Sequence, residues 1–335
     1  MSEFPRCIYF YEKYAGTWIL VKTPGEARAI SWKRRSTSSG DSARNSLTHY
    51  KETNMAIIQL TDIHLDATYN GKFPTMEHFD RVIQDIRTRR SESLLKDDVI
   101  IITGDICDGE DKYYYDIVFD MMHRAFPETP VFVTPGNHDD RRVLGLIATE
   151  EQKRNKGLGM EFEVAGCVEN PGTHGVKFSH NGHNICIVDT GNAAKDTDNQ
   201  YVHFEFGEDA PVDDRQWLLF THMPLVAVPH RFMQREGFCM TSNNTVYRAL
   251  DSIEAVFCGH YHHAHVTKKD DYVQERGPYT YHGKAKVGQY VCPAIQCQLD
   301  PYSEECSPSG VFPGYQVIHC MADSRKYEVE VRLLY

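Results

Sequence analysis

Short apolar runs and segments of helical periodicity alternate along the chain from residue 55 onward. The runs at 56–60, 99–103 and 131–134 carry no charge, as expected for buried strands. Between them, apolar residues recur every three or four positions over 76–95 and 112–126, which predicts two amphipathic helices, and a third helix is expected soon after Asp139. This β, α, β, α, β order predicts an α/β fold.

Beyond residue 157 the pattern changes to strands separated by Gly and Asn. Strands are expected at 162–165, 176–179, 184–189, 218–221 and 255–258, and Asn181-Gly182 predicts a tight hairpin turn. A polar, acidic loop is expected at 191–214 and a helix at 245–250. Alternating apolar positions over 315–317 and 329–333 predict an antiparallel pair at the end of a second sheet.

Residues 1–54 differ from the rest of the chain. They contain nine Lys or Arg against five Asp or Glu, short β-like runs at 7–11 and 17–22, and a Ser-rich polar stretch at 34–45 typical of a flexible linker. We interpret 1–54 as an N-terminal extension of unknown function and 55–335 as a single folded domain. The alternative for the extension is a small β-hairpin that docks a partner.

Composition restricts the classes of partner. A chain of 335 residues with 41% hydrophobic and 25% charged residues can bury a sizeable core. The net charge of −11 argues against broad binding to nucleic acid or anionic membranes and favours a small-molecule substrate. The ten cysteines form no CxxC pair, no apolar run has the length of a membrane span, and the start lacks a secretory pattern. A reduced, cytoplasmic protein without a membrane partner is therefore expected.

Five of the expected strands end in residues of metal-ligand type. In chain order these residues are Asp62, His64, Asp105, Asn137, His138, His222, His260 and His262. Oxygen and imidazole ligands without thiolate suit Mn, Fe, Zn or Ni rather than a structural zinc cluster. Two ions about 3.5–4 Å apart that share a carboxylate, here Asp105, can hold a hydroxide and clamp a phosphoryl oxygen. We therefore expect the strand ends to converge on one centre of two metal ions.

The motifs DIH, GDICD, PGNHDD, THMP and GHYH, in this order, resemble the five blocks of the calcineurin-like metallophosphoesterases. They cover the chain from about 55 to 265. A single block such as DxH occurs by chance in many proteins, whereas five in order at strand ends are highly specific. The resemblance implies a four-layer αββα sandwich of two mixed β-sheets flanked by helices.

The resemblance also implies a role for each matching residue. Seven side chains would bind two divalent or trivalent transition-metal ions, Mn²⁺, Fe²⁺/Fe³⁺ or Zn²⁺: Asp62, His64 and His262 the first ion, Asn137, His222 and His260 the second, and Asp105 both. His138 would lie outside the metal ligands near the leaving-group oxygen, where it can stabilise charge or protonate the leaving alkoxide, and Asp139 would orient its ring. Asp108 is interpreted as a solvated or supporting residue rather than a ligand. His230 and Arg231 are further candidates for substrate contact.

Sequence details separate the branches of this superfamily. The GDICDGE and GNHDD motifs differ from the GDxVDRG and GNHE of Ser/Thr protein phosphatases. Position 108 is Asp where purple acid phosphatases carry Tyr, and His138 stands where the lipid A pathway pyrophosphatases carry Arg. The segment PGNHDDRRVL looks most like the class III cyclic nucleotide phosphodiesterases and the related glycerophosphodiesterases.

That likeness implies a dinuclear-metal phosphodiesterase acting on a cyclic nucleotide such as 3′,5′-cyclic AMP or a similar small phosphodiester. In-line attack of the metal-bridging hydroxide on phosphorus needs no protein nucleophile. The alternatives are a nuclease or phosphomonoesterase of the same superfamily and, from another class, a catalytically silent scaffold with this fold. A nuclease needs a basic strand-binding surface, which the acidic composition does not favour. Assembly as a homodimer stays open.

Overall fold

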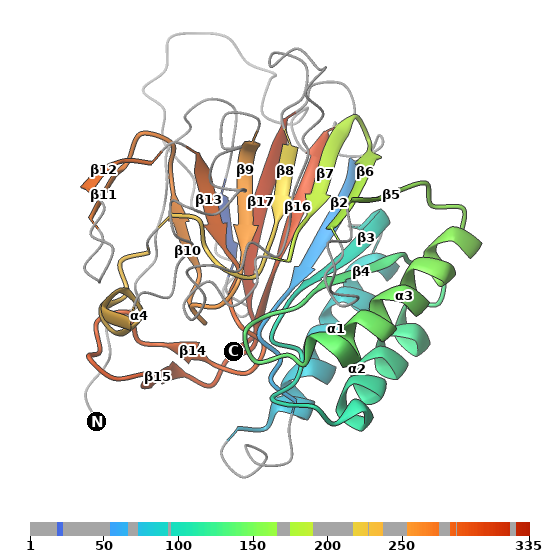
Figure 1. Cartoon of the computed structure of the whole chain (residues 1–335), viewed down its shortest axis with the longest axis horizontal. Helices are drawn as coiled ribbons and strands as arrows, with labels where there is room; N and C mark the ends of the chain where they lie inside the picture. The colour runs from blue at the N-terminus through green and yellow to red at the C-terminus, as the bar shows by residue number, and fades with distance from the viewer. Residues whose placement is uncertain are drawn as a thin grey trace, which may run out of the picture.

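The computed structural model describes residues 19–22, 54–65, 73–92, 95–165, 175–189, 217–226, 228–236, 253–274, 282–285, 287–321 and 326–335. The strand expected at 7–11, the linker at 34–45, the loop at 191–214 and the helix at 245–250 lie outside these ranges. Two large mixed sheets form the centre of the described part, and three long helices lie together on one side of them (Figure 1).

The first sheet has the strand order β1-β17-β16-β2-β3-β4. Its strands are β1 (Ile19–Lys22), β2 (Asn54–Leu60), β3 (Lys96–Thr103), β4 (Val131–Thr134), β16 (Gly314–Met321) and β17 (Tyr327–Leu333). β2, β3 and β4 run parallel, as they must when a helix connects each strand to the next. Those helices are α1 (Thr75–Ser91) and α2 (Lys112–Ala125), and α3 (Arg141–Gly157) follows β4.

The second sheet has the order β10-β13-β9-β8-β7-β6-β5. Its strands are β5 (Glu163–Ala165), β6 (Gly175–His180), β7 (His183–Ile187), β8 (Trp217–Phe220), β9 (Ile253–Cys258), β10 (His265–Thr267) and β13 (Gly288–Val291). Two small hairpins, β11 (Tyr272–Gln274) with β12 (His282–Lys284) and β14 (Gln298–Leu299) with β15 (Pro308–Gly310), and the short helix α4 (Arg231–Glu236) complete the described elements.

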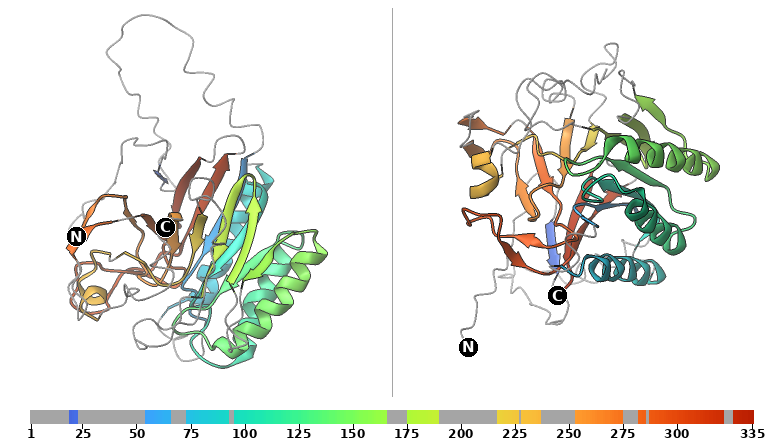
Figure 2. Two further views of the ribbon diagram at one scale, coloured as in Figure 1. Left: turned by 45° about the horizontal axis from the view of Figure 1, so that its top comes forward. Right: turned by 60° about the horizontal axis from the view of Figure 1, so that its bottom comes forward.

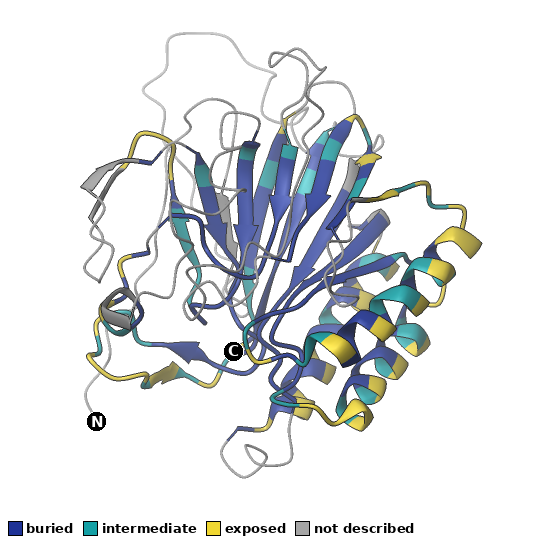
Figure 3. Cartoon of the chain, viewed as in Figure 1, coloured by how far each residue is buried: buried dark blue, intermediate teal, exposed yellow. Residues whose placement is uncertain are grey.

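Three hydrophobic layers hold the elements together. One lies between α1–α3 and the first sheet, with Phe79 and Ile102 among its members. A second lies between the two sheets, where Ile57 and Ile101 of the first meet Phe220 and Phe257 of the second. A third covers the outer face of the second sheet with residues of 223–228 and α4. The strands are buried almost throughout, whereas the helices expose their outer faces (Figure 3).

Most of the expected elements are confirmed, including an α/β fold of two mixed sheets, α1–α3 and the Asn181-Gly182 hairpin, whose two residues have φ of 49° and 78°. The placement of the last strands was wrong. β16 and β17 form an antiparallel pair, but they extend the first sheet beside β2 rather than the second. Alternation of apolar residues reveals that a strand exists and cannot reveal which sheet it joins, because both sheets bury apolar faces.

The layered packing brings five strand ends to one place. These are the ends of β2, β3 and β4 in the first sheet and of β8 and β9 in the second, and the strands of each set are parallel to one another. Figure 2 shows the helices side by side against the sandwich, from two further directions. Ligands in open parallel sheets bind beyond the carboxyl ends of the strands.

Among the helices that the structure describes, none combines the length and the apolar character of a membrane span.

Candidate metal centre

The candidate residues follow their strands on sharply turned backbone. Five of them have positive φ: Asp62 (53°), His64 (50°), Asp105 (50°), His260 (74°) and His262 (50°). Residues other than Gly rarely adopt this left-handed region, although Asp and His tolerate it better than most, and such strained residues cluster at functional sites. The turns direct side chains that are close in sequence into one pocket.

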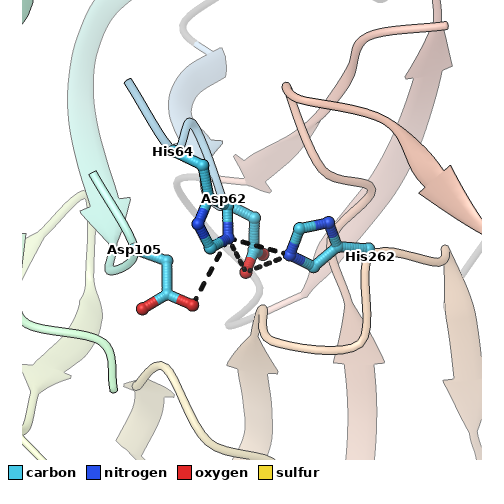
Figure 4. Close-up of side chains that lie close together, drawn as sticks. All are labelled: Asp62, His64, Asp105 and His262. Atoms are coloured by element: carbon cyan, nitrogen blue, oxygen red, sulfur yellow. Dashed lines mark hydrogen bonds and ion pairs between the residues drawn. The ribbon is translucent and has the colours of Figure 1, made fainter. Parts of the chain in front are cut away.

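Four of the side chains form what we call the first cluster: Asp62, His64, Asp105 and His262. His64 Nε2 lies 2.9 Å from His262 Nε2, and 3.5 Å from Asp105 Oδ2. His262 Nε2 in turn lies 3.3 Å from Asp62 Oδ1. The four side chains point at one another from three separate strand ends (Figure 4). The first sheet contributes three of them and the second sheet one.

The second cluster contains Asp105 again, with His222, His260 and Asn137. His222 Nε2 is at its centre, 3.2 Å from Asp105 Oδ2, 3.2 Å from His260 Nδ1 and 3.0 Å from Asn137 Oδ1. All seven residues expected to bind metal are therefore brought together, in two groups that meet at the Asp105 carboxylate.

These contacts fit a pair of cations. Carboxylate oxygens and imidazole nitrogens converge, and each pair of facing ring nitrogens can hydrogen-bond only if one of them carries a proton. A cation between them would accept every lone pair at once. The residues of both clusters are buried except Asn137, which is partly exposed. Water therefore does little to stabilise the negative charges of Asp62 and Asp105. The clustered Asp and His residues form a plausible dinuclear metal site.

Hydrogen bonds and close packing hold the carboxylates in place. Asp105 Oδ1 accepts the backbone N–H of His138 at 2.9 Å, which leaves Oδ2 for both clusters. The Asp62 carboxylate accepts the backbone N–H of His260 at 3.0 Å, a bond that joins the two sheets. Gly136 and Gly259 allow the loops to approach this closely. A Cβ on Gly136 would overlap Asp105 Oδ1, and a Cβ on Gly259 would overlap Thr61.

Backbone hydrogen bonds from a later segment of the chain hold the same turns in place. The backbone N–H of Gln296 donates to Asp62 O at 3.0 Å, and that of Leu299 donates to His262 O at 2.7 Å. The ring of His78 on α1 contacts Gln296 O at 2.8 Å and fixes this segment to the helical layer. Segment 295–299 thereby supports turns that belong to different sheets.

Burial and mutual attraction shift the ionisation of the two clusters. Burial raises the pKa of Asp62, but His262 and other neighbouring imidazoles outweigh it and bring the pKa down to about 2. Burial lowers the pKa of His222, yet the Asp105 carboxylate raises it to about 9. Burial and the adjacent His222 lower the pKa of His260 to about 3. The proton held by His222 therefore offsets part of the negative charge of the buried carboxylates.

Asp108, which was expected to support the site at most, contacts two of its histidines. Its Oδ1 lies 2.7 Å from His64 Nδ1 and 2.8 Å from His138 Nδ1. Hydrogen bonding to Asp108 raises the pKa of His138, whose side chain is 49% exposed at the mouth of the site. A carboxylate three residues after Asp105, in a tight loop at a strand end, was the available sequence signal.

Asp139 does not orient the His138 ring as expected. Its Oδ1 accepts the backbone N–H of Ile106 and the hydroxyl of Tyr115, and its Oδ2 accepts the N–H of Gly136 at 2.8 Å. Because both oxygens are engaged, Asp139 ties the loops after β3 and β4 together. The carboxylate at the His138 ring is that of Asp108.

His230 is not a member of either cluster, although it packs against Tyr261 between His260 and His262. His230 is completely buried with its ring centroid 5.8 Å from that of Tyr261, and burial lowers its pKa to about 4. The Arg231 guanidinium lies 4.0 Å from the exposed Glu304 carboxylate. Neither contact supports a role in binding substrate.

Comparison with known sequences agrees with this geometry. The family described as calcineurin-like phosphoesterase matches residues 55–264. A probable cyclic nucleotide phosphodiesterase of Pseudoalteromonas sp. (strain SM9913) is 24% identical over 294 residues, covering 86% of this chain and 96% of the relative. One of Fibrobacter succinogenes (strain ATCC 19169 / S85) is 25% identical over 249 residues, covering 71% and 83%.

Solved structures also align with the chain. The purple acid phosphatase PPD1 of yellow lupin has a TM-score of 0.45 and 12% identity over 84% of this chain, which spans 55% of the lupin protein. The calcineurin-like phosphoesterase YfkN of Bacillus subtilis has a TM-score of 0.39 and 10% identity, covering 84% of this chain and 90% of that one. The match over 55–264 establishes that the chain belongs to the calcineurin-like phosphoesterase family and is a phosphoric ester hydrolase.

Proposed function

We propose that this phosphoesterase is a dinuclear-metal phosphodiesterase that hydrolyses a small phosphodiester, with 3′,5′-cyclic nucleotides as its substrate class. The observation that carries the proposal is the pair of clusters that share Asp105 Oδ2, which lies 3.5 Å from His64 Nε2 and 3.2 Å from His222 Nε2. Such an arrangement would suit two neighbouring ions, the form of site used for in-line displacement at phosphorus.

In the proposed enzyme, Asp62, His64 and His262 would bind one ion, Asn137, His222 and His260 would bind the other, and Asp105 would contribute to both. Bound there, the ions supply Lewis acidity, a water of lowered pKa and neutralisation of the phosphodiester charge. The oxygen and nitrogen ligands accept Mn²⁺, Fe²⁺/Fe³⁺ or Zn²⁺, and metal availability would decide among them. The protein contributes a rigid ligand set, fixed by the turns and hydrogen bonds described above.

His138 is proposed as the proton donor to the leaving oxygen. Its Nδ1 is bound to Asp108 Oδ1 at 2.8 Å, so the other ring nitrogen remains to face a substrate at the exposed mouth of the site. Asp108 favours the protonated ring and holds its orientation, which are the two requirements for a general acid. His138 is thus a catalytic residue in this proposal and Asp108 a positioning residue.

The choice of substrate class rests on two supports. The two relatives described above carry the name of probable cyclic nucleotide phosphodiesterases and align over 71–86% of the chain. The net charge of −11 offers no general attraction for a nucleic-acid backbone.

The test uses purified full-length protein loaded with Mn²⁺. Turnover of bis(p-nitrophenyl) phosphate and of 3′,5′-cyclic AMP is measured beside p-nitrophenyl phosphate and linear DNA, with Asp105→Asn as the control for contaminating activity. We expect hydrolysis of both diesters, inversion at phosphorus with a chiral substrate, and loss of activity in the control. Preference for the monoester or for DNA ends would replace the substrate class, and no turnover of any substrate would favour the scaffold alternative.

A further inference from the structure

Beneath the metal centre, polar side chains interrupt the apolar layer between the two sheets. Gln59, Thr61, Thr103 and Gln316, which we call the polar floor, are all completely buried. They continue strand faces that are otherwise apolar, since Ile57, Ile101 and Ile318 on the same faces pack against the second sheet. Burying amides and hydroxyls costs free energy unless they are hydrogen-bonded. The presence of four such residues between the sheets therefore has to be explained by their hydrogen bonds.

The Gln59 side chain contacts every strand around it. Its Nε2 donates to Thr103 Oγ1 on β3 at 2.8 Å and to Cys258 O on β9 at 3.3 Å, while its Oε1 accepts Nε2 of Gln316 on β16. Both amide hydrogens and the carbonyl oxygen are thereby used. The bond to Cys258 O crosses from the first sheet to the second, two residues before His260.

Thr103 carries the network to the ligands. Its hydroxyl donates to Leu60 O at 3.3 Å, and its carbonyl oxygen accepts Thr61 Oγ1 at 3.1 Å. The same carbonyl lies 2.8 Å from Nδ1 of His222, which fixes the ring that stands at the centre of the second cluster. Gln59 therefore lies on the strand that leads to Asp62 and is hydrogen-bonded to the strands that lead to Asp105 and His260, and its partner Thr103 holds His222.

Apolar side chains between two sheets resist separation but not small sliding movements, because the hydrophobic effect has no direction. A metal centre built half on each sheet needs its ligands fixed to within about 0.5 Å. We propose that the polar floor sets the position of one sheet against the other for metal binding, with Gln59 as its principal positioning residue. This inference rests on the proposed metal function, and it assigns Gln59 no contact with metal or substrate.

The experiment compares Gln59→Leu, which keeps the side-chain size and removes every amide hydrogen bond, with Asn155→Leu as a matched control. Asn155 is equally buried, and its amide pairs with both backbone groups of Val131 at the opposite end of β4. For each protein, Mn²⁺ affinity is measured by competition with a chelator, and unfolding in urea is followed in EDTA. We expect Gln59→Leu to bind Mn²⁺ about 10- to 100-fold more weakly than wild type, the range for residues that support ligands. Asn155→Leu should be destabilised while keeping its affinity.

Thr103→Val provides a second test if Gln59→Leu does not fold, because it removes the hydroxyl and leaves the carbonyl oxygen at His222. Like Gln59→Leu, it should weaken Mn²⁺ binding relative to the wild-type protein. Wild-type affinity in both Gln59→Leu and Thr103→Val, or equal loss of affinity in the Asn155 control, would overturn the positioning role alone. Absence of Mn²⁺ binding by the wild-type protein would overturn this inference together with the proposed function.

Discussion

The two clusters of the metal centre are made from similar residues but differ in charge and exposure. The first cluster has two carboxylates, Asp62 and Asp105, and every member is at least 90% buried. The second cluster shares Asp105 but replaces the other carboxylate with the neutral and partly exposed Asn137. Divalent ions bind more tightly where more anionic ligands surround them in a rigid site. The first cluster should therefore bind an ion more tightly than the second cluster.

The largest expected effect comes from the residue that both clusters share. Asp105→Asn removes the charge common to the two ions with almost no change in volume. Because metal activation contributes several kcal/mol to catalysis, turnover should fall about 1000-fold or more, and metal analysis should find both ions weakened. Loss of a single ion in this variant would mean that the clusters are independent.

His138→Ala should lower kcat without disturbing either cluster. A positioned general acid contributes typically about 10²- to 10⁴-fold, so we expect a fall of at least about 100-fold. KM and the content of two ions should stay close to wild type, measured by steady-state kinetics and elemental analysis. If one ion were lost, His138 would belong among the ligands instead.

Changes at Asn137 test the difference between the clusters directly. Asn137→Ala should weaken only the second ion, with activity about 10-fold or more lower at limiting Mn²⁺ and recovered at high Mn²⁺. Asn137→Asp, the matched variant, adds a carboxylate and should tighten that ion and narrow the gap between the two affinities. Full activity of Asn137→Ala at limiting metal would contradict the assignment.

Asp108→Asn should have a smaller and mixed effect, because Asp108 contacts a ligand ring and the proposed acid at once. We expect about a tenfold weaker first ion, the lower end for residues that support ligands. The alkaline limb of the pH profile of kcat should move to lower pH, because the hydrogen bond to Asp108 raises the pKa of His138. Asp116 on α2, which forms an exposed ion pair with Lys112, offers a control. Asp116→Asn should change neither the affinity for the first ion nor the pH profile.

The smallest effect concerns proton linkage in the metal-free protein. His222 has its pKa raised to about 9, so its contribution to stability is complete below its ordinary pKa of about 6.5 and is lost as the pH rises through about 9. His260, with its pKa lowered to about 3, instead removes stability as the pH falls below about 6.5. Urea unfolding in EDTA should therefore give lower stability at pH 9 than at pH 7. His222→Gln should flatten that difference, and a stability that rises from pH 7 to 9 in the wild type would contradict this linkage.

The site was more predictable than the fold around it. Asp62, Asp105 and His222 stand directly after apolar runs, and such runs identify strand ends without knowledge of the tertiary fold. The position of β16 and β17 depends on which sheet buries their apolar face, and nothing local records that choice. Similarly, Asp108 and Asp139 are carboxylates in adjacent loops, and only the folded contacts assign the His138 ring to the former.

Local pattern was enough to identify the candidate ligands, because the type of a ligand and its place at the end of a strand are properties of a few consecutive residues. The position of the first sheet relative to the second could not be predicted from local pattern. It depends on side chains such as Gln59, whose partners on β3, β9 and β16 are 44, 199 and 257 positions away along the chain. Contacts over such separations form only when the whole sandwich packs, so the spacing of the two clusters is a property of the assembled fold.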